Sequence, residues 1–189
     1  MTVVPTHGQS GIASLDIATA TGHRGERVEI PIQLSGLGGS PVGAAQVEVR
    51  FDGGVLAFEE LVTAGSLSEG WLVEYNLQPS GQTQTLHIGL AGLQDAAADG
   101  ILLSLAFQVP ADVPFGSFSP LEILGAELEQ DPLGELLALQ TDDGLFRVGV
   151  PPVLWVNQGL VLDEGATAAL TSAQLAVQDV DNPADELVY

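Results

Sequence analysis

Apolar and polar residues alternate along much of this chain, in short runs that glycine and proline interrupt. In residues 46–51 the two sets would point to opposite sides of a strand, with Val47, Val49 and Phe51 against Gln46, Glu48 and Arg50. Residues 28–34 alternate in the same way. Many short runs, frequent turns and no long segment with a helical period predict an all-β protein, an antiparallel β-sandwich.

Two segments depart from this simple strand pattern. Pro31 lies inside an alternating run, and proline lacks the N–H that a strand in a sheet interior uses, so we expect an edge position or a break there. Residues 95–107 begin with an alanine-rich stretch that has weak helical character. We interpret it as a turn that closes at Asp99 and Gly100 before a buried strand.

The last strand of this pattern ends at Gly149, because Pro151 and Pro152 cannot continue a strand in a sheet interior. We expect an N-terminal tail at residues 1–12, a sandwich at 13–149 and a short C-terminal β-strand extension at 150–189. Two or three strands do not make an independent sandwich. The extension is therefore a truncated second domain, or packs on the first, or pairs with another copy.

Charge narrows the range of partners. The 189 residues include 25 Asp and Glu against 4 Arg, with no Lys, and the formal net charge is −21. This surface repels phosphate backbones and anionic bilayers, so we expect no nucleic acid partner and no membrane insertion. Calcium is the plausible small partner. The alternative is that acidity only keeps a secreted or salt-exposed protein soluble.

Four stretches together carry a family resemblance, in the order "RVEIPIQLSGL", "VGAAQVEVRFDGGVLAFEELVTAGSL", "DGILLSLAFQVPADVPFGSFSPLEI" and "DDGLFRVG". Over roughly residues 13–149 they resemble a cohesin domain. The resemblance implies a cohesin-like nine-stranded jelly roll that binds a calcium-loaded dockerin through one sheet face. The chain departs from the pattern at Gly53 and Gly54, where cohesins have a proline after the position of Asp52.

The same resemblance implies a partner-binding face on the strand at residues 45–51 and its neighbours. Its outward residues would be Ala44, Gln46, Glu48, Arg50, Glu74, Asn76 and His87. A flat, mixed polar face with one arginine could form hydrogen-bonded contacts with a helix. The alternative is that these are ordinary solvated positions of a half-buried strand.

The C-terminal stretch "PPVLWVNQGLVLDEGATAALTSAQLAVQDVDNPADELVY" resembles the start of a different unit, a CSPG-type, cadherin-like repeat. Such repeats imply a large, tandem surface protein. The apolar part of this stretch, residues 153–162, could add as an unpaired strand to the sheet edge of another copy. Its apolar residues are Val153, Leu154, Trp155, Val156, Leu160 and Leu162.

Calcium has one main candidate site, in "QDVDNPADE", with the oxygen-bearing residues Asp179, Asp181, Asn182 and Asp185. It is not an EF-hand, because Ala184 stands where the loop needs glycine. The pairs Asp95 with Asp99 and Asp142 with Asp143 are weaker candidates, since hairpin turns use the same residues.

Catalysis has little support in the sequence. His7, His23 and His87 form no recognisable catalytic or metal-binding spacing, and nothing singles out a pair of carboxylates. Trp71, Tyr75 and Trp155 could stack on sugar rings, but a chain with few aromatics needs them as core. We therefore expect no enzyme.

Two hypotheses for function follow. In the first, the chain is an extracellular or cell-surface adhesion or assembly module that binds a dockerin-like protein through the face around Gln46 and Glu48. In the second, it is a structural repeat of a giant surface adhesin, stalk or filament that self-associates by strand addition. The C-terminal stretch favours the second hypothesis, and the ordered strand face favours the first.

Overall fold

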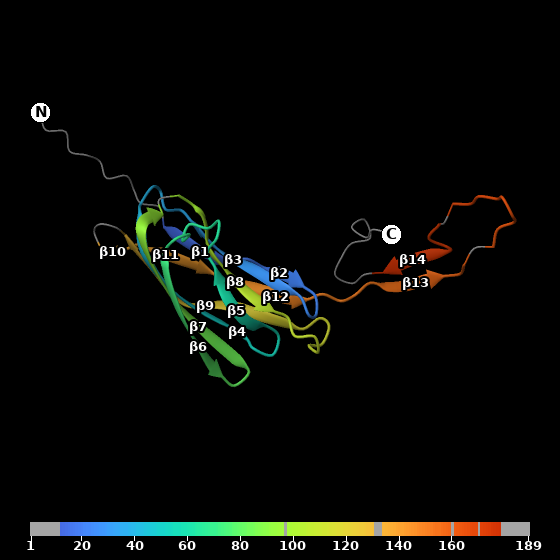
Figure 1. The fold of residues 1–189 in the computed structure, drawn as a ribbon, viewed down its shortest axis with the longest axis horizontal. Coiled ribbons are helices and arrows are strands. Elements are labelled where there is room, and N and C mark those ends of the chain that lie inside the picture. Colours follow the sequence, from blue (N-terminus) through green and yellow to red (C-terminus); the bar gives the residue numbers. More distant parts are fainter. Residues whose placement is uncertain (1–11, 97, 131–133, 160, 170, 179–189) are drawn as a thin grey trace, which may run out of the picture. The chain divides into compact units, whose positions relative to one another are not determined.

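The chain divides into two compact units, Met1–Val148 and Gly149–Tyr189. The computed structural model describes residues 12–96, 98–130, 134–159, 161–169 and 171–178 (Figure 1). All regular elements within these ranges are strands. No helix there has the length and apolar character to cross a bilayer. The all-β prediction is confirmed.

Two sheets form the first unit. The five-stranded sheet has the order β11 (Leu139–Asp142), β1 (Ala13–Ile17), β3 (Arg27–Ser35), β8 (Gly100–Gln108) and β5 (Ala57–Val62). The seven-stranded sheet has the order β2 (Ala20–Gly22), β12 (Gly144–Val148), β9 (Phe118–Gln130), β4 (Val42–Asp52), β7 (Thr83–Ala96) and β6 (Leu72–Ser80), with β10 (Glu135–Leu136) on β9. Neighbouring strands are antiparallel, except that β1 pairs with β11 and β2 with β12 in parallel.

The apolar side chains of the alternating runs meet between the two sheets. On β4, Val47, Val49 and Phe51 are at most 1% exposed. On β3, Ile30 and Ile32 are fully buried in the same core cluster. Burial of one such side chain stabilises the fold by roughly 1.5–3 kcal/mol. Each sheet thus gives one face to a shared core, which confirms the antiparallel sandwich.

The nine strands of the expected jelly roll can be identified among the elements of the first unit. Its described residues form twelve strands, from β1 to β12. Three of these are short, since β2, β10 and β11 have 3, 2 and 4 residues. The other nine make up the bulk of both sheets. The short strands extend the sheets at places where the sequence shows no alternating run.

The two segments that depart from the strand pattern have different outcomes. The alanine-rich segment is a turn and a strand, as predicted, because β7 ends at Ala96 and β8 begins at Gly100. The prediction for Pro31 is wrong, since β3 runs through it between β1 and β8. The Pro31 carbonyl accepts a hydrogen bond from Ala18 (3.1 Å), beyond the end of β1. The missing N–H faces the same side, so Pro31 cannot return this bond, and the β1–β3 ladder ends one position earlier, at the pair of Ile17 and Ile32.

The second unit contains a two-stranded antiparallel sheet of β13 (Val153–Asn157) and β14 (Leu175–Gln178). The expectation of an unpaired segment is therefore wrong for Val153, Leu154 and Val156, which pair with β14. Trp155 lies at an irregularity in this pairing, and Leu162 lies outside the strand. Leu160 is outside the described residues. A short apolar run finds its partner within the chain because isolated strands leave backbone N–H and C=O groups unpaired.

Candidate functional site

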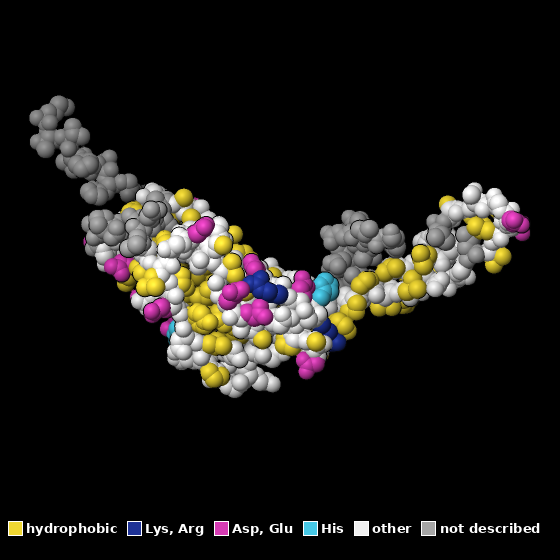
Figure 2. Space-filling view, in the orientation of Figure 1, with side chains coloured by type: hydrophobic (Ala, Val, Ile, Leu, Met, Phe, Trp, Pro, Cys, Tyr) yellow, Lys and Arg dark blue, Asp and Glu magenta, His cyan; other side chains and the backbone are white. Residues whose placement is uncertain are grey.

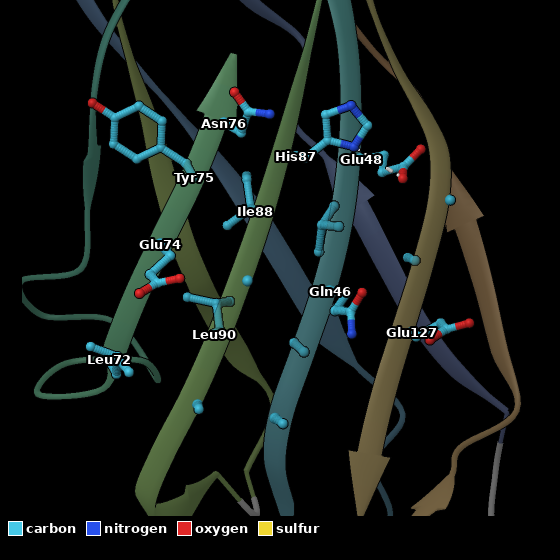
Figure 3. A pocket seen from close by; sticks show the side chains of 17 residues that line it. Gln46, Glu48, Leu72, Glu74, Tyr75, Asn76, His87, Ile88, Leu90 and Glu127 are labelled. Carbon is cyan, nitrogen blue, oxygen red and sulfur yellow. Dashed lines mark ion pairs between the residues drawn. The ribbon is translucent and has the colours of Figure 1, made fainter. Parts of the chain in front are cut away.

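The outward face of the seven-stranded sheet is hollowed over β9, β4, β7 and β6 (Figure 3). The hollow has a volume of about 740 Å³ and is open to solvent. Successive side chains of a strand point to opposite faces. The outward side chains of these four strands therefore line the hollow, while their inward neighbours, such as Val47 and Leu86, build the core.

The strand register arranges the outward residues in rows across the sheet. In the strand order β6, β7, β4 and β9, the first row is Asn76, His87, Glu48 and Gly125. The second row is Glu74, Gly89, Gln46 and Glu127. The third row is Leu72, Ala91, Ala44 and Glu129. Each row joins the β6–β7 hairpin to β4 and β9, which lie far from each other in the sequence. The sheet pairing, rather than any local motif, therefore assembles this surface.

Small residues form the floor of the hollow. Ala91 on β7 pairs with Ala44 on β4, Gly89 pairs with Gln46 in the next row, and Gly125 lies on β9. A Cβ atom added at Gly89 would meet no atom within 4 Å. At Gly125 it would meet only a carboxylate oxygen of Glu48, at 4.0 Å. The hollow exists because these positions carry at most one side-chain carbon, next to longer side chains such as Gln46 and Glu48.

Acidic side chains dominate the charge of this face. His87 Nδ1 lies 3.1 Å from Glu48 Oε1, so a protonated His87 would pair with that carboxylate. Arg50 lies one row beyond the hollow and donates from Nε to Glu122 (2.7 Å). Glu74 and Glu127, in one row, form no ion pair within the described part of the chain. The lining thus keeps uncompensated negative charge.

Six of the seven residues expected on a partner-binding face line the hollow, and Arg50 lies just outside it. The structure brings these residues together; their role in binding stays a prediction. Sequence reasoning missed the other outward residues of the lining, Leu72, Gly89, Ala91, Gly125 and Glu127. A signal for part of them is present, because small residues recur at every second position after His87.

The three aromatic residues considered for sugar stacking have separate environments. Trp71 packs against the core, as expected. Tyr75 is half-exposed, and its ring contacts Phe58 of β5 edge to face, with centroids 5.2 Å apart. Trp155 is 73% exposed, so the expectation that it is a core residue is wrong. Trp71 and Tyr75 belong to the first unit, and Trp155 belongs to the second.

Among the described residues, no group of three or more His, Asp or Glu side chains could hold a metal ion. The main calcium candidates, Asp179, Asp181, Asn182 and Asp185, lie outside those residues. Two weaker candidates have structural roles. The Asp99 carboxylate accepts a hydrogen bond from the Leu37 N–H (3.2 Å), and the Asp143 carboxylate accepts one from the Ile123 N–H (2.8 Å).

The chain belongs to the cohesin family, because residues 13–126 match the family model described as "Cohesin domain". Cohesins are non-catalytic binding modules. One curated relative is Cellulose-binding protein A of Clostridium cellulovorans, 23% identical over 153 residues, which are 80% of this chain and 8% of that protein. Another is the mouse extracellular matrix organizing protein FRAS1, 44% identical over 52 residues, 25% of this chain and 1% of that protein. The chain thus spans a small part of either relative.

Solved cohesin structures share the fold. A non-cellulosomal cohesin from Archaeoglobus fulgidus is 23% identical, with a TM-score of 0.58 over 72% of this chain and 90% of its own. The cohesin–dockerin complex of OlpA from Clostridium thermocellum is 15% identical, with a TM-score of 0.63 over 72% and 98%. A scaffoldin B cohesin of Acetivibrio cellulolyticus, in complex with a dockerin, is 18% identical, with a TM-score of 0.59 over 72% and 98%. These relatives confirm the cohesin-like jelly roll.

Proposed function

We propose that the chain is an extracellular or cell-surface attachment module that binds a dockerin-like protein over the hollow on β9, β4, β7 and β6. The hollow itself is the observation that carries this proposal. Its floor of Gly89, Ala91 and Ala44 lets a partner approach the sheet backbone. Gln46 and Asn76 supply amide donors and acceptors beside that floor. Membership of the cohesin family supports the same conclusion.

The polar character of the face fits a partner that binds reversibly. Interfaces of this kind are about as apolar as the rest of a protein surface, and they gain specificity from hydrogen bonds. Leu72, 67% exposed, is the large apolar side chain at the margin of the hollow. A partner that buries it removes apolar area from water, which stabilises the complex.

A bulky side chain on the floor tests the attachment function. Gly89→Trp fills the hollow without touching the core, since Gly89 faces open space. We expect the dissociation constant for calcium-loaded dockerin modules from the same genome to rise roughly 30-fold or more, the effect of losing an interface anchor. Surface plasmon resonance measures it. The matched control is Gln33→Trp, at an exposed position on the five-stranded sheet.

Two results would contradict the proposal. One is that none of the dockerin modules from the same genome binds the wild-type chain. The other is binding to which Gly89→Trp and Gln33→Trp make no difference, because the partner would then use a different surface. Circular dichroism and the urea midpoint of both variants show that the sandwich remains intact.

A second function, assembly through the C-terminal unit, has its own supporting observation. β13 presents Val153, Leu154 and Trp155 with more than half of each side chain exposed. A two-stranded sheet alone is marginally stable in water, so this unit gains stability from an added strand. The similarity of part of the chain to an extracellular matrix organizing protein also supports a structural role outside the cell.

Light-scattering mass after size exclusion tests assembly. The masses of residues 1–189 and 1–150 are compared, each with calcium and with chelator. The shorter chain keeps the hydrophobic core, because the core cluster lies wholly within the first unit. Assembly of only the longer chain supports strand addition, and its loss in chelator implicates calcium. Monomers under all conditions would rule this function out.

A further inference from the structure

Four strands lie at the edges of the two sheets of the first unit, and among the described residues β6 has the one long and regular edge that is free. β2 and β11 have three and four residues, and β5 has a register irregularity between Phe58 and Glu60. β6 has nine residues and pairs with β7 without an irregularity. Within the described part of the chain, β7 is the one element whose backbone bonds to β6. The N–H and C=O groups on the other side of β6 are therefore free to pair with a further strand.

A half-exposed aromatic ring marks this edge. Tyr75 alternates with Val73 and Leu77, which pack against the core, and its ring contacts Phe58 of the other sheet. Tyr75 is nevertheless 52% exposed, because no strand follows β6 in the sheet as described. Figure 3 shows the ring beyond the edge of β6, on the side away from β7. A strand added to β6 would cover this ring and extend the seven-stranded sheet.

β13 of the second unit has complementary features. In the described part of that unit it pairs with β14 on one side, and its other edge is free. Val153, Leu154 and Trp155 are each more than half exposed, so both faces of β13 present apolar side chains. A strand of this kind fits beside β6, where Tyr75 lies toward one face of the sheet and the exposed Leu72 toward the other.

Charge favours this pair of edges over others. Each copy has a formal net charge of −21, so two copies repel each other at long range. β13 and β14 contain no charged residue, and β6 contains only Glu74. β5, at the edge of the other sheet, carries Glu59 and Glu60, which pair with Arg27. Repulsion between copies is therefore weaker where β13 meets β6 than where it meets β5.

We propose that the free edge of β6 accepts β13 of another copy as an added strand. This inference rests on the assembly function proposed above and names the acceptor. β13 keeps its pairing with β14, which uses the opposite edge, so the two-stranded sheet of one copy extends the seven-stranded sheet of the next. Donor and acceptor are different surfaces. Each copy can therefore donate and accept at once, and the contacts propagate head to tail.

Two chains that each lack one half of the contact test the inference. Tyr75→Lys places an inward-pointing charge at the edge of β6, a device that blocks strand addition. Residues 1–150 lack β13. At high NaCl, which screens the repulsion between copies, we expect light scattering to show that each of these chains alone is monomeric. Their mixture should form a complex with one copy of each, because Tyr75→Lys still donates β13 and residues 1–150 still offer β6.

Leu136→Lys is the matched control. Leu136 is 63% exposed on β10, which pairs with β9, three strands away from β6. Both lysine variants reduce the negative charge equally, so charge alone would make both associate slightly more readily. We expect Leu136→Lys to assemble as the wild-type chain does and Tyr75→Lys not to assemble. Circular dichroism and the urea midpoint of both variants show that the sandwich remains intact.

Hydrogen exchange of the unaltered chain gives a second measurement. In assembled residues 1–189, the β6 amides that point away from β7 should exchange roughly tenfold more slowly, or slower still, than in residues 1–150, because they gain hydrogen-bond partners. The amides of the short edge strands β2 and β11 should exchange equally in both.

Three results would overturn the inference: assembly of Tyr75→Lys at the wild-type level, no complex in the mixture, or unchanged exchange at β6. The assembly function would survive any of these if residues 1–189 assemble and residues 1–150 do not, since β13 would then use another acceptor. Wild-type chains that stay monomeric under all conditions would remove the assembly function itself. The two failures are therefore distinguishable.

Discussion

At the scale of single residues, two glycines three positions apart on β7 have opposite surroundings. Gly89 faces the hollow, where an added Cβ atom meets nothing within 4 Å. Gly92 faces inward, and a Cβ atom there would lie 2.4 Å from Cε2 of the Trp71 ring. One glycine is therefore needed for an open surface, and the other for close packing of an indole against the sheet.

Alanine substitutions should separate these two roles. Gly92→Ala forces the Trp71 ring to move, so we expect a loss of roughly 1–3 kcal/mol in the free energy of unfolding, typical of overpacking. Gly89→Ala should stay within about 1 kcal/mol of wild type and could stabilise, because alanine loses less backbone entropy in a strand. Urea unfolding followed by tryptophan fluorescence measures both. Equal midpoints for the two variants would contradict this account of Gly92.

At the scale of elements, a series of aromatic contacts connects the two sheets. Phe51 of β4 packs edge to face on Phe107 of β8, with ring centroids 5.0 Å apart. Phe107 also contacts Phe58 of β5 at 5.9 Å, and Phe58 contacts Tyr75 of β6 at 5.2 Å. β5 and β6 are the last strands of their sheets, so the series closes the sandwich along that side.

Loss of the central ring should be costly. Phe107 is fully buried, and Phe107→Ala would leave a cavity beside Phe51 and Phe58. We expect the free energy of unfolding to fall by about 3–5 kcal/mol, as for other buried phenylalanines. Phe118→Ala is the control, since Phe118 is 56% exposed and its removal should cost less than 1 kcal/mol. A differential scanning calorimetry trace in which both variants unfold alike would contradict the role of Phe107.

The elements also show how far sequence reasoning reaches. The alternation in β3 and β4 predicts which residues are buried, because side chains of a strand have a period of two. Pro31 was misjudged because its cost depends on whether β1 still runs beside it, and the chain order does not reveal that. The outward residues of β4 were predictable in the same way. The floor residue Gly125 and the rim residue Glu127 were not, since the pairing of β9 with β4 joins residues about 80 positions apart.

At the scale of the whole molecule, like charges are the dominant long-range force. The chain has 25 acidic residues and 4 arginines, and Figure 2 shows acidic side chains spread over the visible face with few basic ones among them. Two of the arginines are engaged locally. Hydrogen bonds from Arg27 to Glu29 and Glu60 raise the pKa of its guanidinium, and Arg50 pairs with Glu122. Most carboxylates thus repel one another across the surface, which favours the more expanded unfolded chain.

Salt should therefore stabilise this protein. The screening length falls from about 30 Å at 0.01 M salt to about 3 Å at 1 M, and repulsion between distant carboxylates weakens accordingly. We expect the urea midpoint to rise steadily with NaCl, urea being uncharged. A midpoint that falls with NaCl would mean that the ion pairs of Arg27 and Arg50 outweigh the repulsion.

The same titration with CaCl₂ at matched ionic strength separates charge screening from calcium binding. Equal urea midpoints in the two salts indicate screening alone. A higher midpoint in CaCl₂ indicates a specific calcium site, for which the aspartates at 179, 181 and 185 are the first to replace.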